Sequence, residues 1–373
     1  MKLSSLATSS RRQFVSAAAL LLCACGGSDR PIRVGAAGNW RESYGVMGKR
    51  GIDLAVEEIN AQGGVRRRPL DVVAEDDSSD GARAVRVASK FLADPDILGV
   101  IGHLESGTSV AAAPIYDKGL AAISSTATSP SLSGISPWVF RVISSDSMNG
   151  RDIAAYARRA GLQRAAVLYE NNSYGRGLSD AFIRHFSGRV VASDPIASDS
   201  VSDLEPTLAW IRQHKPDVVF VAGTAASGIA VLREARRQGI AATFMGGDGW
   251  SGVIASGPLA EGVLVATPFA VEDPRDEVRL FAQRFRARYG ADPDQNAALA
   301  YDATKLLARA IEDAGPSRQA VRDWLATNLS GAPFQGVTGS IQFTPSGDVV
   351  GKSVVITRIR NGAFHVEGAA RGS

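Results

Sequence analysis

The order of apolar and amphipathic segments constrains the fold of this chain most strongly. Short runs rich in Val, Ile and Ala, such as IRVGAAG at 32–38 and VVFVAG at 218–223, alternate with segments whose apolar residues recur at helical spacing. Strands that are apolar along their whole length must be covered on both faces, which is typical of parallel sheets flanked by helices. The alternation therefore predicts an α/β fold.

This alternation runs through the chain as two series, one before and one after residue 148. A chain of 373 residues is also too long for one typical core and suits two domains. The pattern predicts two doubly wound parallel-sheet lobes. The expected strands are 32–38, 70–77, 96–102, 119–126, 164–171, 216–224, 242–249 and 261–269, and the expected helices are 48–64, 81–94, 148–161, 175–186, 203–214 and 226–239.

The first 24 residues have the pattern of an export signal. A basic start is followed by an apolar stretch from Phe14 to Leu22 and then by small residues. Arg11 and Arg12 add a twin-arginine pattern. The apolar stretch is shorter than the roughly 20 residues that a membrane-spanning helix needs. We therefore interpret residues 1–24 as a signal peptide.

The end of this signal resembles a bacterial lipobox. Leu22, Cys23 and Ala24 precede Cys25, which we expect to be lipidated and to begin the mature protein, with 25–30 as a tether. We expect an exported protein, anchored by lipid to a bacterial membrane on its periplasmic or extracellular side. The chain has two cysteines, and both lie in this segment, so the remainder can form no disulfide framework.

The net charge changes when the signal is removed. Lys2, Arg11 and Arg12 are the only charged residues in 1–24, and the remaining 38 basic residues balance 38 acidic ones. A neutral chain gives no support to nucleic-acid binding, which requires a basic patch or stripe.

The segment GHLESGTS at 102–109 invites two enzymatic interpretations, and both fail. A phosphate-binding loop requires lysine where Thr108 stands. A serine nucleophile elbow requires glycine where Leu104 stands, two residues before Ser106. His103 lies near Ser106 in sequence, which is not evidence of a general base. We therefore expect no catalytic residues and no enzymatic activity.

The acidic run EDDSSD at 75–80 is the other candidate for site chemistry. Its spacing lacks the period of a calcium loop, and the four histidines lack the spacing of metal ligands. Acidic residues at a strand end are also favoured where a helix begins. We therefore expect no metal site, and no cofactor.

The strand ends instead offer the groups that hold an amino acid. Hydroxyls such as those of Ser106 and Thr128, beside the amides of helix N-termini, bind a carboxylate without a cationic side chain. Asp248, in the glycine-rich segment MGGDGW, can accept hydrogen bonds from an ammonium group. Ligands of open parallel sheets bind beyond the carboxyl ends of the strands. The sequence therefore predicts a polar, amino-acid-like ligand.

Several motifs together resemble the substrate-binding proteins of branched-chain amino-acid ABC transporters, the Leu/Ile/Val-binding type. They include VIGHLESGTSVAAAPIY, ISSTATSP, NSYGRGLSDAF, FMGGDGW and GVTGSIQFTPSGD, and the resemblance covers roughly residues 31–362. It implies a type I periplasmic-binding-protein fold, in which two lobes joined by three crossovers close on the ligand. The implied crossovers lie near Ser144, Pro268 and Phe343. The implied lobes are 31–144 plus 269–343 and 145–268 plus 344–365, with a tail at 366–373.

The resemblance also assigns roles to individual residues. Ser106 and Thr128 match hydroxyls that bind the carboxylate and ammonium of the ligand, and Thr126 matches a backbone contact beside them. Asp248 matches the acid that binds the α-ammonium. The implied ligand-binding set is Tyr44, Ser106, Thr126, Thr128, Tyr174, Thr224 and Asp248, in which Tyr44 and Tyr174 are the aromatic residues of the two lobes.

The chain departs from the family pattern around the ligand side chain. Thr224 stands where many members have an aromatic residue, and Glu105 follows Leu104 in the first-lobe loop. The first loop, GNWRESYG, is shorter than usual and brings Arg41 and Glu42 near the mouth. We expect the pocket rim to include Trp40, Glu105 and Trp250.

These features predict an exported solute-binding lipoprotein. It would capture a small amino acid or a related carboxylate or amide between its lobes. It would then deliver this ligand to the permease and ATPase subunits of an ABC importer. The alternative is an extracytoplasmic sensor that reports ligand to a separate membrane receptor or kinase.

Overall fold

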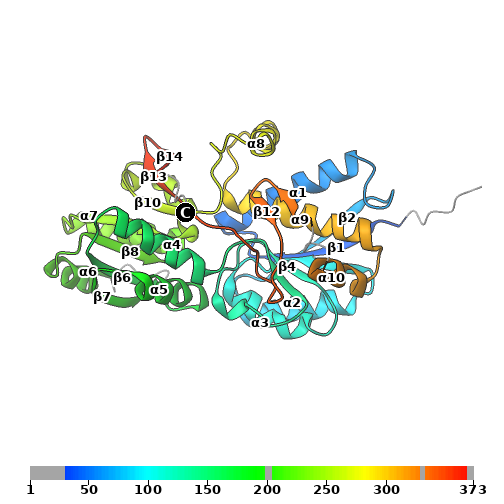
Figure 1. Ribbon diagram of the computed structural model, residues 1–373, viewed down its shortest axis with the longest axis horizontal. Helices are drawn as coiled ribbons and strands as arrows, with labels where there is room; N and C mark the ends of the chain where they lie inside the picture. Colours follow the sequence, from blue (N-terminus) through cyan, green and yellow to red (C-terminus); the bar gives the residue numbers. More distant parts are fainter. Residues whose placement is uncertain (1–29, 198–203, 328–331, 368–373) are drawn as a thin grey trace, which may run out of the picture.

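The computed structural model describes residues 30–197, 204–327 and 332–367. Two lobes lie side by side along the long axis of the molecule (Figure 1). The lobe with the blue and cyan elements also contains the orange helices, whereas the green lobe also contains the red strands near the C-terminus. Segments distant in sequence thus share each lobe, and the expected two-lobed α/β fold is confirmed. The signal peptide and Cys25 lie outside the described residues.

The first lobe contains a five-stranded parallel sheet in the order β2-β1-β3-β4-β5. Because β2 and β3 lie on opposite sides of β1, the chain changes direction across the sheet between β1 and β3. The strands are β1 (Ile32–Gly38), β2 (Leu70–Asp76), β3 (Ile97–Ile101), β4 (Ala122–Ser124) and β5 (Val139–Arg141).

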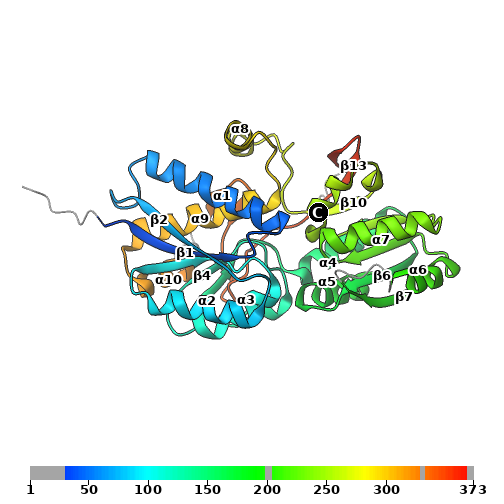
Figure 2. The ribbon, with the colours of Figure 1, turned by 180° about the vertical axis from the view of Figure 1, so that it is seen from behind.

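Helices cover both faces of this sheet. Figure 2 shows α1 (Ser43–Ala61) and α9 (Gln295–Ala314) above β1, and α2 (Gly81–Ala93) and α3 (Ser106–Tyr116) below it. The residues of α2 at helical spacing form its buried face, as expected: Ala84, Val87, Ala88 and Phe91. The other elements of the lobe are η1 (Pro130–Leu132), α8 (Asp276–Tyr289), α10 (Arg318–Thr327), β11 (Phe334–Gly336) and β12 (Gly339–Ile341).

The second lobe contains a seven-stranded sheet in the order β14-β13-β10-β9-β8-β6-β7. β13 pairs antiparallel with both β10 and β14, so the expectation of a purely parallel sheet is wrong at this edge. β14 includes Val366, so the tail expected from 366 begins too early. The strands are β6 (Arg164–Glu170), β7 (Arg189–Ile196), β8 (Val218–Ala222), β9 (Thr243–Gly246), β10 (Leu264–Thr267), β13 (Val355–Arg360) and β14 (Ala363–Val366).

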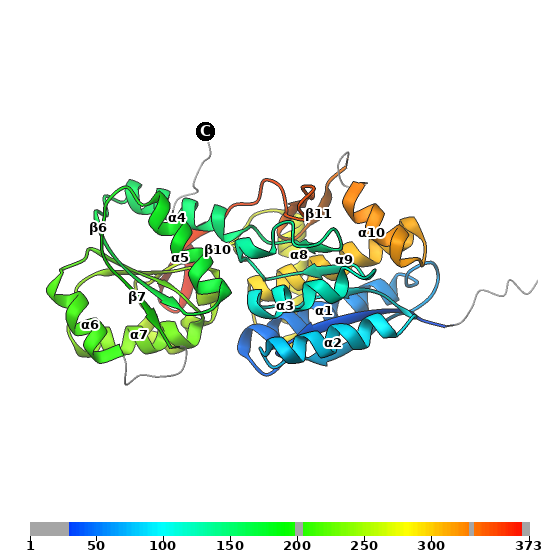
Figure 3. The ribbon, with the colours of Figure 1, turned by 90° about the horizontal axis from the view of Figure 1, so that it is seen from below.

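The second sheet is also covered on both faces. Figure 3 shows its strands between α4 and α5 on one side and α6 and α7 on the other. Here the chain changes direction across the sheet between β6 and β8, which lie next to each other. The helices are α4 (Asp146–Arg159), α5 (Ser173–His185), α6 (Leu204–Gln213), α7 (Ala225–Arg237) and the 3₁₀ segment η2 (Asp248–Ala260). Among the described residues, no helix is both long and apolar enough to cross a membrane.

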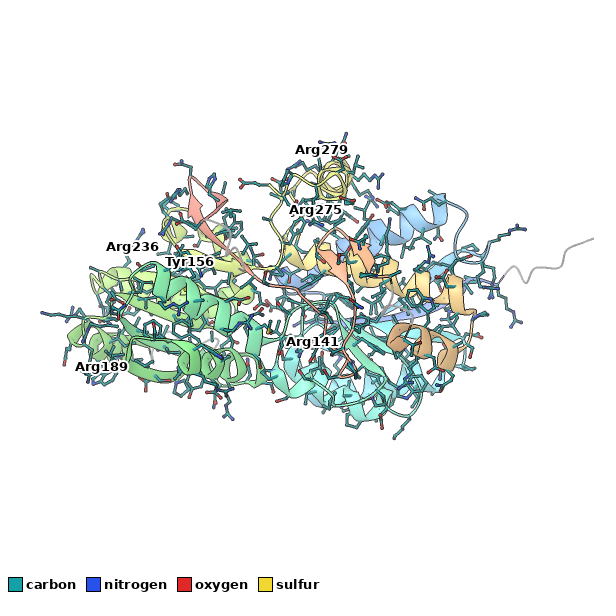
Figure 4. The ribbon with its side chains drawn as sticks, viewed as in Figure 1. Arg141, Tyr156, Arg189, Arg236, Arg275 and Arg279 are labelled. Carbon is teal, nitrogen blue, oxygen red and sulfur yellow. The ribbon has the colours of Figure 1, made fainter. Side chains whose placement is uncertain are left out.

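The third crossover lies later in the chain than Phe343. The amide of Arg141 donates to the carbonyl of Gly347 at 3.0 Å, and its guanidinium donates to Asp348 at 2.7 Å. Arg141, labelled in Figure 4, belongs to the first lobe. The segment around Gly347 therefore packs on the first lobe, and the chain crosses between there and Val354, which lies in the core of the second lobe.

Candidate ligand-binding site

The expected site residues gather where each sheet changes direction. In the first lobe, Tyr44 lies in the first turn of α1 after β1, and Glu105 and Ser106 lie at the start of α3 after β3. In the second lobe, Tyr174 lies in the first turn of α5 after β6, and Thr224 precedes α7 after β8. Crevices of this kind, beyond the carboxyl ends of parallel strands, are where ligands bind in doubly wound sheets.

Ser106 is the first residue of α3 and is 3% exposed. Its hydroxyl accepts hydrogen bonds from the amides of Thr128 and Ser129 at 3.2 and 3.1 Å, which draws the loop after β4 onto the start of α3. The loop before α3 is fixed by Ser109, whose hydroxyl donates to the carbonyl of His103 at 3.0 Å. The first amides of a helix have no intrahelical partner, so this corner presents positive partial charge. It suits a carboxylate.

Thr128 connects this corner to the first crossover. Its carbonyl accepts a 2.8 Å hydrogen bond from the amide of Asp146, the first residue of α4. The Thr128 hydroxyl is completely buried and has no hydrogen-bond partner among the described residues. Both carboxylate oxygens of Asp146 beside it also lack a hydrogen bond of good geometry among the described residues, although Thr128 and Asn149 lie close enough to lower the pKa of Asp146. Buried polar groups are almost always paired, so these atoms mark a place for a ligand or water.

Asp248 begins η2 in the second lobe and is 5% exposed. The hydroxyl of Tyr174 donates to its Oδ1 at 3.0 Å and accepts from the amide of Gly249 at 3.0 Å. The side chain of Gln295, on α9 of the first lobe, donates to the carbonyl of Asp248 at 2.6 Å. Asp248 is therefore fixed by groups from both lobes.

Asp146 and Asp248 form a buried acidic pair. Burial raises the pKa of Asp248 to about 6. Burial and the charge of Asp248 together raise the pKa of Asp146 well above its usual value. Burial and both carboxylates also raise the pKa of Tyr174, which stays a neutral donor. A cation placed here would relieve the repulsion, so the pair suits an ammonium group.

Glu105 points toward the first-lobe rim. Its Oε1 accepts hydrogen bonds from the hydroxyl of Tyr44 and, at 2.7 Å, from that of Ser79. Burial raises the pKa of Glu105, and the charges of Asp77 and Glu170 raise it further. Because Glu170 belongs to the second lobe, acidic groups of both lobes contribute to the raised pKa of Glu105.

Thr224 does not offer a free hydroxyl to the site. Its amide and its hydroxyl donate to Oε1 of Glu170 at 2.8 and 2.7 Å, and Asn172 donates to Oε2 at 3.0 Å. Thr224 thus orients Glu170. Sequence reasoning missed both Glu170 and Asp146. The sequence pattern that could have indicated Glu170 is a carboxylate at the end of an apolar strand. For Asp146 it is a carboxylate at the start of a helix beside a crossover.

The structure places the expected rim residues and Thr126 in different surroundings. The indole of Trp40 donates to the carbonyl of Glu75 at 3.0 Å at the carboxyl edge of the first sheet. The hydroxyl of Thr126 donates to the carbonyl of Leu104 at 2.6 Å. Trp250 is wrong as a rim residue, because it is completely buried in the core of the second lobe.

His103 is held as a structural residue. One ring nitrogen lies 2.6 Å from Asp77 and the other 3.0 Å from the hydroxyl of Tyr116. Both nitrogens are therefore occupied, and His103 does not serve Ser106 as a base. In the described part of the chain, no group of three or more His, Cys, Asp or Glu residues could hold a metal ion.

Comparisons with known proteins agree with this geometry. Residues 31–363 match the family model described as periplasmic binding protein. A leucine-, isoleucine-, valine-, threonine- and alanine-binding protein of Pseudomonas aeruginosa is 31% identical over 316 residues, which cover 82% of this chain and 83% of that protein. The Leu/Ile/Val-binding protein of Escherichia coli is 34% identical over 244 residues, covering 63% of this chain and 66% of that protein.

Solved structures show the same architecture. An ABC transporter substrate-binding protein of Desulfitobacterium hafniense, in complex with Leu, is 33% identical, with a TM-score of 0.80 over 90% of this chain and 100% of that one. A branched-chain amino acid transporter substrate-binding protein of Streptococcus pneumoniae, in complex with isoleucine, has a TM-score of 0.84 at 26% identity, covering 91% and 98% of the two chains. The chain belongs to the periplasmic binding protein family, whose members bind ligands and are not enzymes.

Proposed function

We propose that this protein captures a small amino acid, or a closely related carboxylate or amide, between its two lobes. The observation that carries this proposal is a chain of contacts across the lobes. Ser106 binds the Thr128 amide, the Thr128 carbonyl binds the Asp146 amide, and Asp146 lies within electrostatic reach of Asp248. These contacts support a carboxylate site next to an ammonium site.

The carboxylate of the ligand would bind at the start of α3. The Ser106 hydroxyl and the first amides of the helix are donors there, and no cationic side chain is needed. These hydrogen bonds would be charge-assisted and shielded from water, which makes them stronger than neutral ones.

The α-ammonium of the ligand would bind between Asp248 and the Thr128 hydroxyl. Asp248 accepts, and its position is fixed by Tyr174 from the same lobe. The buried hydroxyl of Thr128, beside Asp146, would supply a second acceptor. The ligands named for the relatives from D. hafniense and S. pneumoniae, Leu and isoleucine, carry both of these charged groups and support this assignment.

The further steps follow from the transporter class of these relatives and from the N-terminal sequence. We propose that Cys25 is lipidated and holds the protein on the outer side of a bacterial membrane. There it would pass its ligand to the permease and ATPase subunits of an ABC importer. Labelling with a radioactive fatty acid tests the anchor: Cys25→Ala should lose the label, and Cys23→Ala should keep it.

Isothermal titration with a panel of amino acids, aromatic acids and short amides tests the ligand assignment. We expect at least one α-amino acid to bind with a dissociation constant in the micromolar range or below. Absence of both heat and a thermal shift with every amino acid would refute the amino-acid assignment. Turnover of a bound amide would instead indicate an enzyme.

A further inference from the structure

Two carboxylates from opposite lobes lie at the carboxyl ends of the strands that border the candidate site. Glu105 immediately precedes α3 in the first lobe, and Glu170 ends β6 in the second. The charge of Glu170 contributes to the raised pKa of Glu105, so the two groups are within electrostatic reach. Each lies at the point where its sheet changes direction, which is where ligands bind in this kind of sheet.

No cation forms an ion pair with the rim carboxylates in the described part of the chain, although the charge of Arg141 lowers the pKa of Asp146 at the inner pair. Among the ion pairs of the described residues, none includes Glu105, Asp146, Glu170 or Asp248. Arg41, on the neighbouring loop, lies 3.8 Å from Asp76 and has a side chain that is 82% exposed. Buried carboxylates are normally paired or bound to a cation, so an acidic crevice without one favours a positively charged guest.

The spacing of the carboxylates favours an extended organic cation over a metal ion. Within the described ranges, no three acidic, histidine or cysteine side chains come close enough together to hold a metal. Asp146 and Asp248 form one centre of negative charge, and Glu105 with Glu170 forms another. An amino acid with a neutral side chain carries one positive group, its α-ammonium. This group can neutralise only the centre formed by Asp146 and Asp248.

The unpaired atoms support two separate contacts. At the inner centre, the buried Thr128 hydroxyl and both Asp146 oxygens have no hydrogen-bond partner in the described part of the chain. At the rim, Tyr44 and Ser79 both bind Oε1 of Glu105, and no described residue donates to its Oε2. Tyr44 and Ser79 thus fix the carboxylate while leaving one oxygen to accept from a ligand.

We propose that the protein selects α-amino acids whose side chain ends in an ammonium or guanidinium group, and that Glu105 receives this distal cation. Glu170, held by Thr224 and Asn172, supplies the opposing negative charge from the second lobe. This inference rests on the proposed function, because the α-carboxylate and α-ammonium must first be held at Ser106 and Asp248.

The test uses pairs of ligands that differ only in the distal charge. Lysine is compared with norleucine, and arginine with citrulline, by isothermal titration against the mature protein. We expect at least one basic member to bind roughly tenfold or more tightly than its neutral partner, because charge-assisted hydrogen bonds replace contacts with water. Glu105→Gln keeps an acceptor for Tyr44 and Ser79 and should reduce this preference roughly tenfold, with norleucine or leucine affinity unchanged or increased.

Glu42→Gln is the matched control, because Glu42 is exposed near the same mouth and makes no hydrogen bond with its side chain among the described residues. Glu42→Gln should leave the preference for the basic over the neutral ligand within about twofold of that of the unsubstituted protein. Neutral amino acids that bind as tightly as basic ones would overturn the inference and leave the proposed function standing. Equal weakening of both ligands by Glu105→Gln would also overturn it. If neither neutral nor basic amino acids bind, the proposed function itself fails.

Discussion

The carboxylates of Asp146 and Asp248 interact in a buried setting, although one begins α4 and the other begins η2. The charge of Asp248 raises the pKa of Asp146, and neither oxygen of Asp146 has a hydrogen-bond partner among the described residues. Such an arrangement is unfavourable when both groups are ionised. A bound ammonium group relieves it, so ligand binding and protonation of this pair are linked.

The first prediction concerns pH. The pKa of Asp248 is about 6 in the folded protein and near 3.8 when unfolded, so the folded state holds the extra proton between these values. The free energy of unfolding of the ligand-free protein should therefore fall as pH rises from about 4 to 6. An ammonium ligand needs the ionised form, so its affinity should rise by up to about tenfold per pH unit below pH 6 and level off above.

Titration calorimetry in two buffers of different ionisation enthalpy checks this linkage. Proton release on binding should be measurable near pH 6 and should disappear in Asp248→Asn. Binding that takes up protons at this pH would contradict the assignment of Asp248 as the ammonium acceptor.

The second prediction separates the two charged ends of the ligand. Asp248→Asn keeps an acceptor for the Tyr174 hydroxyl but removes the negative charge. Loss of one partner of a buried charge pair costs about 2–5 kcal/mol of binding free energy. We expect that loss for amino acids, whereas the corresponding acids without an ammonium group should be spared. Equal loss for both ligand types in titration calorimetry would argue against the role of Asp248.

The third prediction concerns the two buried serines of α3. Ser106→Ala should weaken amino-acid binding by about 1–3 kcal/mol, because the ligand carboxylate loses a donor and the amides of Thr128 and Ser129 lose an acceptor. Ser109→Ala removes a hydroxyl that, among the described residues, binds the His103 carbonyl alone. It should lower the melting temperature without changing affinity. The pair is compared by thermal unfolding and calorimetry, and a larger affinity loss in Ser109→Ala would reverse the assignment.

The fourth prediction tests the position of Trp250. A Cβ at Gly246 would lie 2.1 Å from Cδ2 of the Trp250 ring, which packs in the core of the second lobe. Gly246→Ala should therefore lower the free energy of unfolding by about 1–3 kcal/mol through overpacking. Gly107→Ala, in α3 with no atom within 4 Å of the added methyl group, should be neutral or stabilising. Denaturant unfolding of both variants decides between a core and a rim position.

The fifth prediction concerns the anchor of the third crossover. The buried guanidinium of Arg141 donates to Asp348, to the carbonyl of Ser129 and to the hydroxyl of Ser133. Arg141→Lys keeps the charge but cannot make all three contacts, because an ammonium group lacks the planar fork of donors. We expect a loss of about 1.5–3 kcal/mol in the free energy of unfolding. An unchanged denaturation midpoint would show that this crossover is not held by Arg141.

The sequence alone determined the fold class and the edges of the sheets at which the site lies. Strands such as Val218–Ala222 are apolar throughout, and helices such as Gly81–Ala93 have one apolar face, so local patterns fix both the elements and their layers. The family motifs in turn led to Ser106 and Asp248. The antiparallel edge at β13 and β14 was missed, because pairing direction is set by where the chain returns to the sheet and not by local pattern.

Only the tertiary structure decided which side chains share the site. Trp250 adjoins Asp248 in the loop sequence, yet it turns into the core because Gly228 and Gly246 leave room for its ring. Asp146 and Glu170 are unremarkable in the sequence. They become important because packing brings Asp146 near Asp248 within the second lobe and Glu170 within electrostatic reach of Glu105 across the lobes. Burial and long-range electrostatic contact depend on the packing of distant segments, which no local pattern contains.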